Sequence, residues 1–346
     1  MDRYYDMAVM GLTRKTDSPK KQVSPRRKGG NIDLKTSLDQ EFDALMAFVG
    51  ARSFTQMCDA VKQNLRYFEG KEKHNYTATV NYYNKYKMWG ELHPDIGVWE
   101  LVENRAQAFT EHREDFIWLY GKLADYRSKR VLYNILSFWL SCDYQKTDLL
   151  KDKYFGQYFD LDLIRCDKNE VLVDIGAYIG DTMVDYTNTY GKDCYKRIYC
   201  YEIVPENVGY IHKNIELFHL SNIVVRACGA SDRAGTLYLP DAAASSVKTL
   251  SETGNVAVPT VTIDDDIDEP VTFIKMDIEG AEEQALLGCR KKIAESHPKL
   301  ALAAYHNHKD MWRLARIIDE TDPTYKFYLR YYGNPLLPTE YVLYAV

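Results

Sequence analysis

The chain has 346 residues, of which 46% are hydrophobic, and a formal net charge of −6 at pH 7. This length exceeds one typical domain, so we expect two domains, and the apolar content suffices for a sizeable core. The acidic balance argues against nucleic acid as the main partner. No apolar run reaches membrane-spanning length and no signal peptide is evident, which predicts a cytoplasmic protein without a membrane partner.

The cysteines favour the same location. They are seven in number and none forms a C-x-x-C pair, so we expect reduced thiols and neither a disulfide framework nor a zinc site. The chain also has 28 tyrosines, a residue that suits core packing as well as contact with polar, ring-shaped ligands.

Before residue 160 the sequence indicates no strand. Residues 1–36 are rich in Lys, Arg, Ser, Pro and Gly and are expected to form a flexible basic arm, with docking on a partner as the alternative. Residues 37–159 carry apolar side chains at helical spacing, beginning with Leu38, Phe42 and Leu45, and predict a helical domain. The aromatic segment Tyr154–Phe159 at its end either packs in the core or covers a ligand.

The stretch Val171–Thr182 predicts a buried strand, a glycine turn and a helix. This unit opens nucleotide-binding α/β sheets, whose ligands lie at the carboxyl ends of the strands. Its pattern is D-x-G-x-x-x-G, formed by Asp174, Gly176 and Gly180, and it lacks the third glycine of a dinucleotide fingerprint. Asp174 suits a ligand with a positive group, such as S-adenosylmethionine, whose carboxylate could rest on the N–H groups near Gly180–Thr182. The alternative is a tight turn without a ligand.

Two more strands are expected to follow. Arg197–Glu202 ends in an acid that could accept hydrogen bonds from both hydroxyls of a ribose, the alternative being a helix cap or a solvated strand end. Asn222–Cys228 is the third strand, and the small residues of Gly229–Asp232 stand where a flat adenine would lie. Further short strands are expected over Thr236–Leu239 and Val256–Ile263. The acidic run Asp264–Glu269 is interpreted as a solvated loop or a helix start, and no metal ligands are predicted.

The stretch Val271–Gly280 predicts a strand ending at Asp277. Lys275 lies inside it and needs a partner, which Asp277 or Glu279 could supply, since residues two apart share a face of a strand. After a further strand, Leu300–Ala304, His306 or His308 could act as a general base, although a loop histidine is more often simply exposed.

The C-terminus predicts two strands, Tyr325–Tyr332 and Thr339–Val346, whose short connection requires them to be antiparallel. A parallel sheet closed by an antiparallel hairpin is the methyltransferase variant of the doubly wound fold. A dehydrogenase would continue with another βαβ half.

Together these motifs resemble the FkbM-type S-adenosylmethionine-dependent methyltransferases over roughly Asp160 to Val346. The resemblance rests on Val173–Thr182, Tyr201–Asn207, Lys213–Ile215 and Ile274–Glu282, with Ile203 departing from the proline that the family usually has. It implies a doubly wound, Rossmann-like class I methyltransferase domain over residues 160–346, beside the helical domain.

The resemblance implies methyl transfer from S-adenosylmethionine to a hydroxyl on a sugar or other natural product. The expected partner is a small hydroxylated acceptor, and a homodimer is a further option. Asp277 and His306 are the candidate catalytic bases, and Lys275 is expected to be structural. The expected cofactor-binding residues are Asp174, Gly176, Ala177, Tyr178, Gly180, Asp181, Thr182, Glu202, Ile203, Asn207, Gly229, Ala230, Ser231 and Asp277. A catalytically silent cofactor-binding module and a nicotinamide dehydrogenase are the alternatives.

Overall fold

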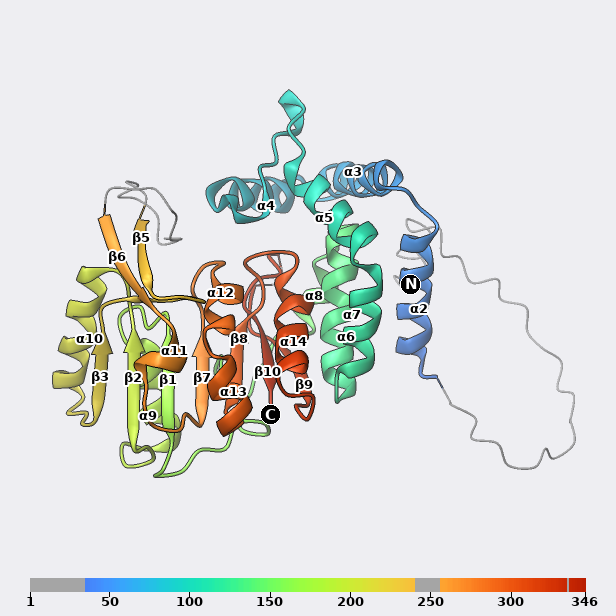
Figure 1. Cartoon of the computed structure of the whole chain (residues 1–346). Coiled ribbons are helices and arrows are strands. Elements are labelled where there is room, and N and C mark those ends of the chain that lie inside the picture. Colours follow the sequence, from blue (N-terminus) through green and yellow to red (C-terminus); the bar gives the residue numbers. More distant parts are fainter. Residues whose placement is uncertain (1–34, 240–255, 335) are drawn as a thin grey trace, which may run out of the picture.

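A seven-stranded mixed sheet forms the centre of the molecule, a computed structural model that describes residues 35–239, 256–334 and 336–346 (Figure 1). The strand order is β3-β2-β1-β7-β8-β10-β9. Five neighbouring strands are parallel, and β10 runs antiparallel to both β8 and β9. The expected doubly wound sheet with an antiparallel C-terminal pair is therefore confirmed. The arm predicted over residues 1–36 lies outside the described residues except for its last two.

The strands are short and mostly apolar on both faces, as expected of a covered parallel sheet. Those of the main sheet are β1 (Val171–Ile175), β2 (Arg197–Tyr201), β3 (Ile223–Arg226), β7 (Phe273–Met276), β8 (Lys299–Ala303), β9 (Phe327–Tyr331) and β10 (Tyr341–Ala345). A second, three-stranded sheet is formed by β4 (Gly229–Ala230), β5 (Gly235–Leu239) and β6 (Val256–Val261), in the order β4-β6-β5.

Helices cover both faces of the main sheet. On one face, α9 (Asp181–Tyr190) and α10 (Pro205–Leu217) bury Tyr186 and Ile211 against Leu172 and Ile198. The opposite face is covered by α12 (Glu282–Leu287), α13 (Arg290–Ser296) and α14 (Asp310–Thr321). The predicted acidic run forms α11 (Ile263–Asp266), in agreement with a helix start.

Of the N-terminal helices, α6 and α7 lie beside the β9 edge of the sheet with α2 outermost, and α3 and α4 lie across the top of the view (Figure 1). The first two begin with capping boxes, in which Thr36 pairs with Asp39 and Ser53 with Gln56. The helices of this region are α2 (Ser37–Gly50), α3 (Phe54–Lys71), α4 (Lys73–Lys85), η2 (Lys87–Trp89), η3 (Pro94–Ile96), α5 (Glu100–Glu111), α6 (Arg113–Lys122), α7 (Tyr126–Ser141) and α8 (Gln145–Asp148). No helix of the described chain is long and apolar enough to cross a membrane.

A single hydrophobic cluster extends from the N-terminal helices into the sheet. It joins Leu45 of α2 and Leu136 of α7 to Leu314 of α14 and Leu343 of β10, and all four side chains are buried. Both regions contribute to this cluster, and the division into two domains at residue 160 stays a prediction.

Side chains along β1 alternate between the two faces. Val171, Val173 and Ile175 belong to the cluster under α12–α14, whereas Leu172 belongs to the cluster under α9 and α10. Asp174 therefore points to the α9 side of the sheet, where its partners in register are Cys200 on β2 and Lys275 on β7.

Candidate functional site

A cavity of about 360 Å³ opens where β1, β2, β3 and β7 end. This is the carboxyl edge of the parallel strands, the usual ligand position in open α/β sheets. Ten of the predicted site residues line it: Gly176, Tyr178, Asp181, Thr182, Glu202, Ile203, Asn207, Gly229, Ala230 and Asp277. The structure therefore brings together residues from four separate strand ends.

Five other predicted site residues do not line the cavity. Asp174, Ala177 and His306 are buried behind it, and Ser231 lies just beyond the end of β4. Gly180 is the N-cap of α9, and its left-handed φ of +82° favours glycine, although a Cβ there would meet Ile211 only at an ordinary contact distance of 3.5 Å.

Gly176 forms the floor of the turn after β1. Its φ is +82°, and a Cβ on it would lie 1.9 Å from the carbonyl oxygen of Asp277. No side chain fits there without moving the β7 loop, so glycine is required by contact as well as by φ. The turn and the end of β7 are thus held against each other at the cavity wall.

Lys275 takes a different partner from the two proposed for it. Its Nζ lies 2.9 Å from Asp174 Oδ1 and donates to the Gly176 carbonyl oxygen at 2.7 Å. Burial raises the pKa of Asp174 to about 6, although the charge of Lys275 opposes this. The Asp174–Lys275 pair supports the glycine turn from below, and Asp174 does not line the cavity.

Glu202 ends β2 at the cavity wall and is only 6% exposed. Its Oε1 accepts a hydrogen bond from the Val204 N–H at 2.7 Å. Burial raises its pKa, and the Val204 N–H opposes the shift. The small residues Gly229 and Ala230 lie in the same wall, so a carboxylate stands beside space for a flat group.

Acids and a histidine cluster at the end of β7. His306 Nε2 lies 3.4 Å from Asp277 Oδ1 and 3.3 Å from Glu279 Oε2, and its Nδ1 lies 2.8 Å from Glu282 Oε1. Tyr158 donates to the other Asp277 oxygen, Oδ2, at 2.7 Å. Burial alone would lower the pKa of His306, but the nearby Glu282 and Glu279 carboxylates raise it well above 6.5.

The opposite wall holds residues that the sequence interpretation missed. Glu340 lies just before β10, and its Oε2 accepts hydrogen bonds from Gln157 Nε2 at 2.9 Å and from Tyr305 Oη at 3.1 Å. Burial, followed by the charge of Asp277, raises its pKa above 4.5. The antiparallel direction of β10 could have revealed Glu340, because the start of an antiparallel strand lies at the carboxyl ends of its parallel neighbours.

The aromatic segment before the sheet contributes both to the core and to the cavity wall, and its covering of a ligand stays a prediction. Gln157 and Tyr158 line the cavity, whereas Phe159 packs edge-to-face on Tyr186 and Phe273 in the core. Tyr154 is exposed.

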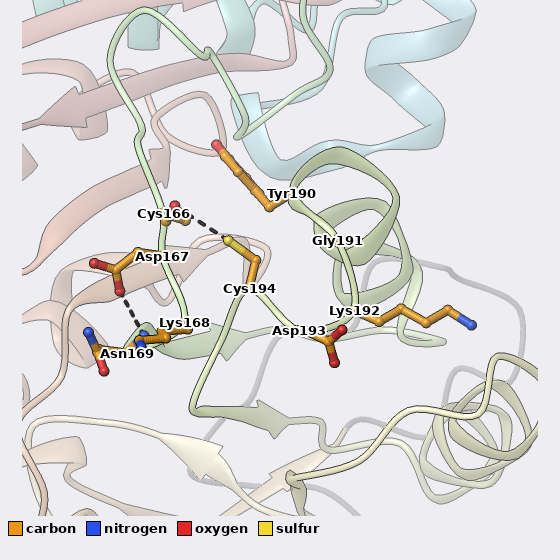
Figure 2. A pocket seen from close by; sticks show the side chains of 9 residues that line it. All are labelled: Cys166, Asp167, Lys168, Asn169, Tyr190, Gly191, Lys192, Asp193 and Cys194. Carbon is orange, nitrogen blue, oxygen red and sulfur yellow. Dashed lines mark hydrogen bonds between the residues drawn. The ribbon is translucent and has the colours of Figure 1, made fainter.

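A larger hollow of about 640 Å³ lies at the other end of β1 and β2. Figure 2 shows its lining, contributed by Cys166–Asn169 before β1 and by Tyr190–Cys194 after α9, with Cys194 Sγ directed at the Cys166 carbonyl oxygen. Burial raises the pKa of the Cys166 thiol to about 12, so this thiol is unreactive at neutral pH. We assign the functional site to the smaller cavity because the acids and the strand ends meet there.

Comparison with known proteins agrees with this geometry. Residues 174–334 match the profile of the methyltransferase FkbM domain. The crystal structure of methyltransferase FkbM from Methylobacillus flagellatus KT superposes with a TM-score of 0.62 at 29% sequence identity, covering 72% of this chain and 64% of that one. The chain thus spans about 64% of the length of that relative.

Two further structures resemble the chain too weakly to carry an argument. They are an rRNA methylase from Streptococcus thermophilus (TM-score 0.36, 14% identity, covering 52% of this chain and 87% of that one) and a putative methyltransferase from Streptococcus mutans in complex with SAH (TM-score 0.36, 15% identity, 56% and 99%). No curated protein sequence matches the chain. The match of residues 174–334 to the methyltransferase FkbM domain and the similarity to the Methylobacillus flagellatus structure agree with the strand order and the strand-end cavity.

Proposed function

We propose that the protein is an S-adenosylmethionine-dependent methyltransferase that methylates a hydroxyl group of a sugar or other natural product in the cytoplasm. The observation that carries the proposal is Glu202, a buried carboxylate that ends β2 in the wall of the strand-end cavity, beside the small residues Gly229 and Ala230. The match of residues 174–334 to the FkbM domain supports the same reading.

The cavity residues fit this cofactor. Glu202 would accept hydrogen bonds from the ribose hydroxyls, and Gly229 and Ala230 leave room for the adenine. The N-terminus of α9 has no side-chain cap, so its N–H groups can bind the cofactor carboxylate. The acids Asp181 and Asp277 in the same wall suit the cofactor's positive groups. When bound, S-adenosylmethionine supplies an electrophilic methyl group.

The acceptor hydroxyl must be aligned and must lose its proton. Two carboxylates in the cavity wall can take that proton, Asp277 and Glu340, and each is held by tyrosine hydroxyls, from Tyr158 and Tyr305 respectively. His306 lies behind Asp277 and is 1% exposed, so we propose that it positions Asp277.

The acceptor is proposed to bind between the sheet and the segment before it. Gln157 and Tyr158 supply an amide and an aromatic ring to the cavity, and Tyr305 and Glu340 supply a hydroxyl and a carboxylate. Such a mixture of rings and hydrogen-bonding groups suits a sugar-like molecule with several hydroxyls.

Calorimetry of the full chain with S-adenosylmethionine, its demethylated product and NAD tests the cofactor. We expect binding of the first two and none of NAD, and preferential NAD binding would favour a dehydrogenase instead. Incubation with S-adenosylmethionine and a panel of sugars and glycosides, read by mass spectrometry, then tests transfer. The expected product is heavier by one methylene. Cofactor binding without transfer to any hydroxyl would favour a silent binding module.

A further inference from the structure

The cluster at the end of β7 has the arrangement of a cation site. His306 Nε2 lies between two carboxylate oxygens, Asp277 Oδ1 at 3.4 Å and Glu279 Oε2 at 3.3 Å. Atoms of Asp277, Glu282 and His306 also lie within 4.8 Å of one another. Ligands that share one transition metal at about 2.0–2.2 Å are themselves roughly 3.0–3.5 Å apart. The two separations from His306 Nε2 fall in that range.

The histidine at the centre of the cluster is buried without an aligned partner. His306 is 1% exposed, and neither ring nitrogen makes a hydrogen bond of acceptable geometry, even though carboxylate oxygens lie close to both. Glu282, at 0% exposure, likewise has one oxygen without a hydrogen bond. Buried polar atoms are normally satisfied, and an ion at Nε2 would satisfy the ring nitrogen that faces Asp277 and Glu279.

Five carboxyl groups surround this histidine. Glu282 and Asp310 are buried beside His306, and Asp277, Glu279 and Glu340 face it from the cavity. The nearby cation Lys275 contacts Asp174 and the Gly176 carbonyl instead. A second positive group would offset the repulsion among these carboxylates.

We propose that this cluster binds one divalent transition-metal ion through His306 Nε2, Asp277 Oδ1 and Glu279 Oε2. One imidazole nitrogen and two carboxylate oxygens suit ions such as Mn²⁺ or Zn²⁺, whereas Mg²⁺ seldom takes imidazole. Glu282, on the far nitrogen of the ring, fixes the orientation of His306. Asp277 and Glu279 also line the cavity, so the remaining coordination positions face the acceptor.

The ion's role in the reaction rests on the proposed function. A divalent ion held by His306, Asp277 and Glu279 would lower the pKa of an acceptor hydroxyl that it coordinates. The oxygen then forms a bond to the methyl carbon, the carbon–sulfur bond breaks with its electron pair moving to sulfur, and the hydroxyl proton passes to Glu340. Asp277 serves as a ligand in this arrangement and Glu340 as the proton acceptor.

Binding is measured on the full chain without S-adenosylmethionine, so the site and the proposed function can fail separately. The probe is Mn²⁺, added to chelator-treated protein and followed by the electron paramagnetic resonance of the free ion. We expect one ion per chain. The substitution His306→Gln should abolish binding, and Glu279→Gln, at a side chain that is 32% exposed, should weaken it by about tenfold or more.

Glu283→Gln is the matched control. Glu283 is a neighbouring acid that forms ion pairs with Lys309 and Arg313, each at 2.7 Å. Its replacement by Gln is expected to leave the Mn²⁺ affinity unchanged. Circular dichroism establishes that each variant is folded. The proposal is overturned if the wild-type chain leaves the Mn²⁺ signal unaltered at millimolar ion. It is equally overturned if both Glu279→Gln and Glu283→Gln bind Mn²⁺ with the affinity of the wild-type chain.

Discussion

Arg330 donates from Nε to Asp160 Oδ2 at 2.7 Å, in the interior of the protein. The same guanidinium donates from Nη2 to Asp125 Oδ2 at 2.8 Å. Arg330 belongs to β9 and Asp125 is the N-cap of α7, so one side chain joins the sheet edge, the N-terminal helices and the segment that connects them. Asp160 is fully buried and Arg330 is 3% exposed.

Replacing Arg330 with Met should therefore lower the free energy of unfolding by about 3–5 kcal/mol, because it removes the closest partner of the buried Asp160 charge and leaves only Arg127, at 3.9 Å, as a cation nearby. Urea denaturation measures this loss. Arg290→Met is the control, since the Arg290–Glu320 pair is exposed and is worth at most about 1 kcal/mol. A similar loss in both variants would contradict this view of Arg330.

A fragment of residues 160–346 should not fold cooperatively. It lacks α7, whose Ser128 Oγ accepts from the Leu329 N–H, and the Asp152 N–H that donates to the Tyr331 carbonyl oxygen on β9. It would also expose the shared core along the sheet edge. A thermal melt followed by circular dichroism tests this. Residues 35–346 retain all the described elements and are expected to melt sharply, whereas a sharp melt of the shorter fragment would support the predicted division into two domains.

Gly176→Ala should cost more stability than a left-handed backbone alone explains. Gly191 is the matched position, because its φ of +103° is also left-handed but a Cβ there meets nothing within 4 Å. We expect Gly191→Ala to lose roughly 1–2 kcal/mol and Gly176→Ala clearly more, since its Cβ meets the Asp277 carbonyl. Chemical denaturation of both variants decides this, and equal losses would mean that the β7 loop simply yields.

Glu202→Gln should weaken S-adenosylmethionine binding by roughly 1.5–3 kcal/mol, the usual worth of a hydrogen bond to a charged group. Calorimetry provides the affinity. Glu206→Gln, at an exposed position in the first turn of α10, should leave the affinity unaltered. Equal affinity of the wild type and Glu202→Gln would remove Glu202 from the ribose site.

Glu340→Gln should reduce kcat by about 100-fold or more and leave cofactor affinity nearly unchanged, as expected for a lost proton acceptor. The pKa of Glu340 is raised above 4.5, and a base works only when ionised, so wild-type kcat should rise as pH increases through that raised value. The variant should lose this acidic limb. Steady-state kinetics across pH measure this. A fall in kcat at acidic pH that persists in Glu340→Gln would contradict the role of Glu340 as the proton acceptor.

The strands and most cavity residues were predictable because their signals are local. Gly176 and Glu202 each follow an apolar strand directly in sequence, and the carboxyl end of a parallel strand is a known ligand position. The partner of Lys275 was not predictable in this way. Residues two apart on one strand are about 7 Å apart, whereas neighbouring strands lie about 4.8 Å apart, and the register places Asp174 beside Lys275.

Glu340 was missed for a related reason. It reaches the cavity only because β10 inserts between β8 and β9 in the reverse direction, and this order is a property of the whole sheet. His306 was proposed from its chemistry, but its burial behind Asp277 depends on α12 and α14, which no single motif describes. Contacts between distant segments are set by the tertiary packing, not by local sequence.

The cavity wall concentrates unfavourable backbone geometry. Eight non-glycine residues of the described chain have positive φ, and four of them line the cavity: Tyr158, Tyr178, Glu279 and Glu340. Each costs of order 1–3 kcal/mol relative to a relaxed backbone. Selection for thermostability alone would therefore enrich glycine or asparagine at these four positions. The most stable variants obtained in this way would be those that bind substrate least well.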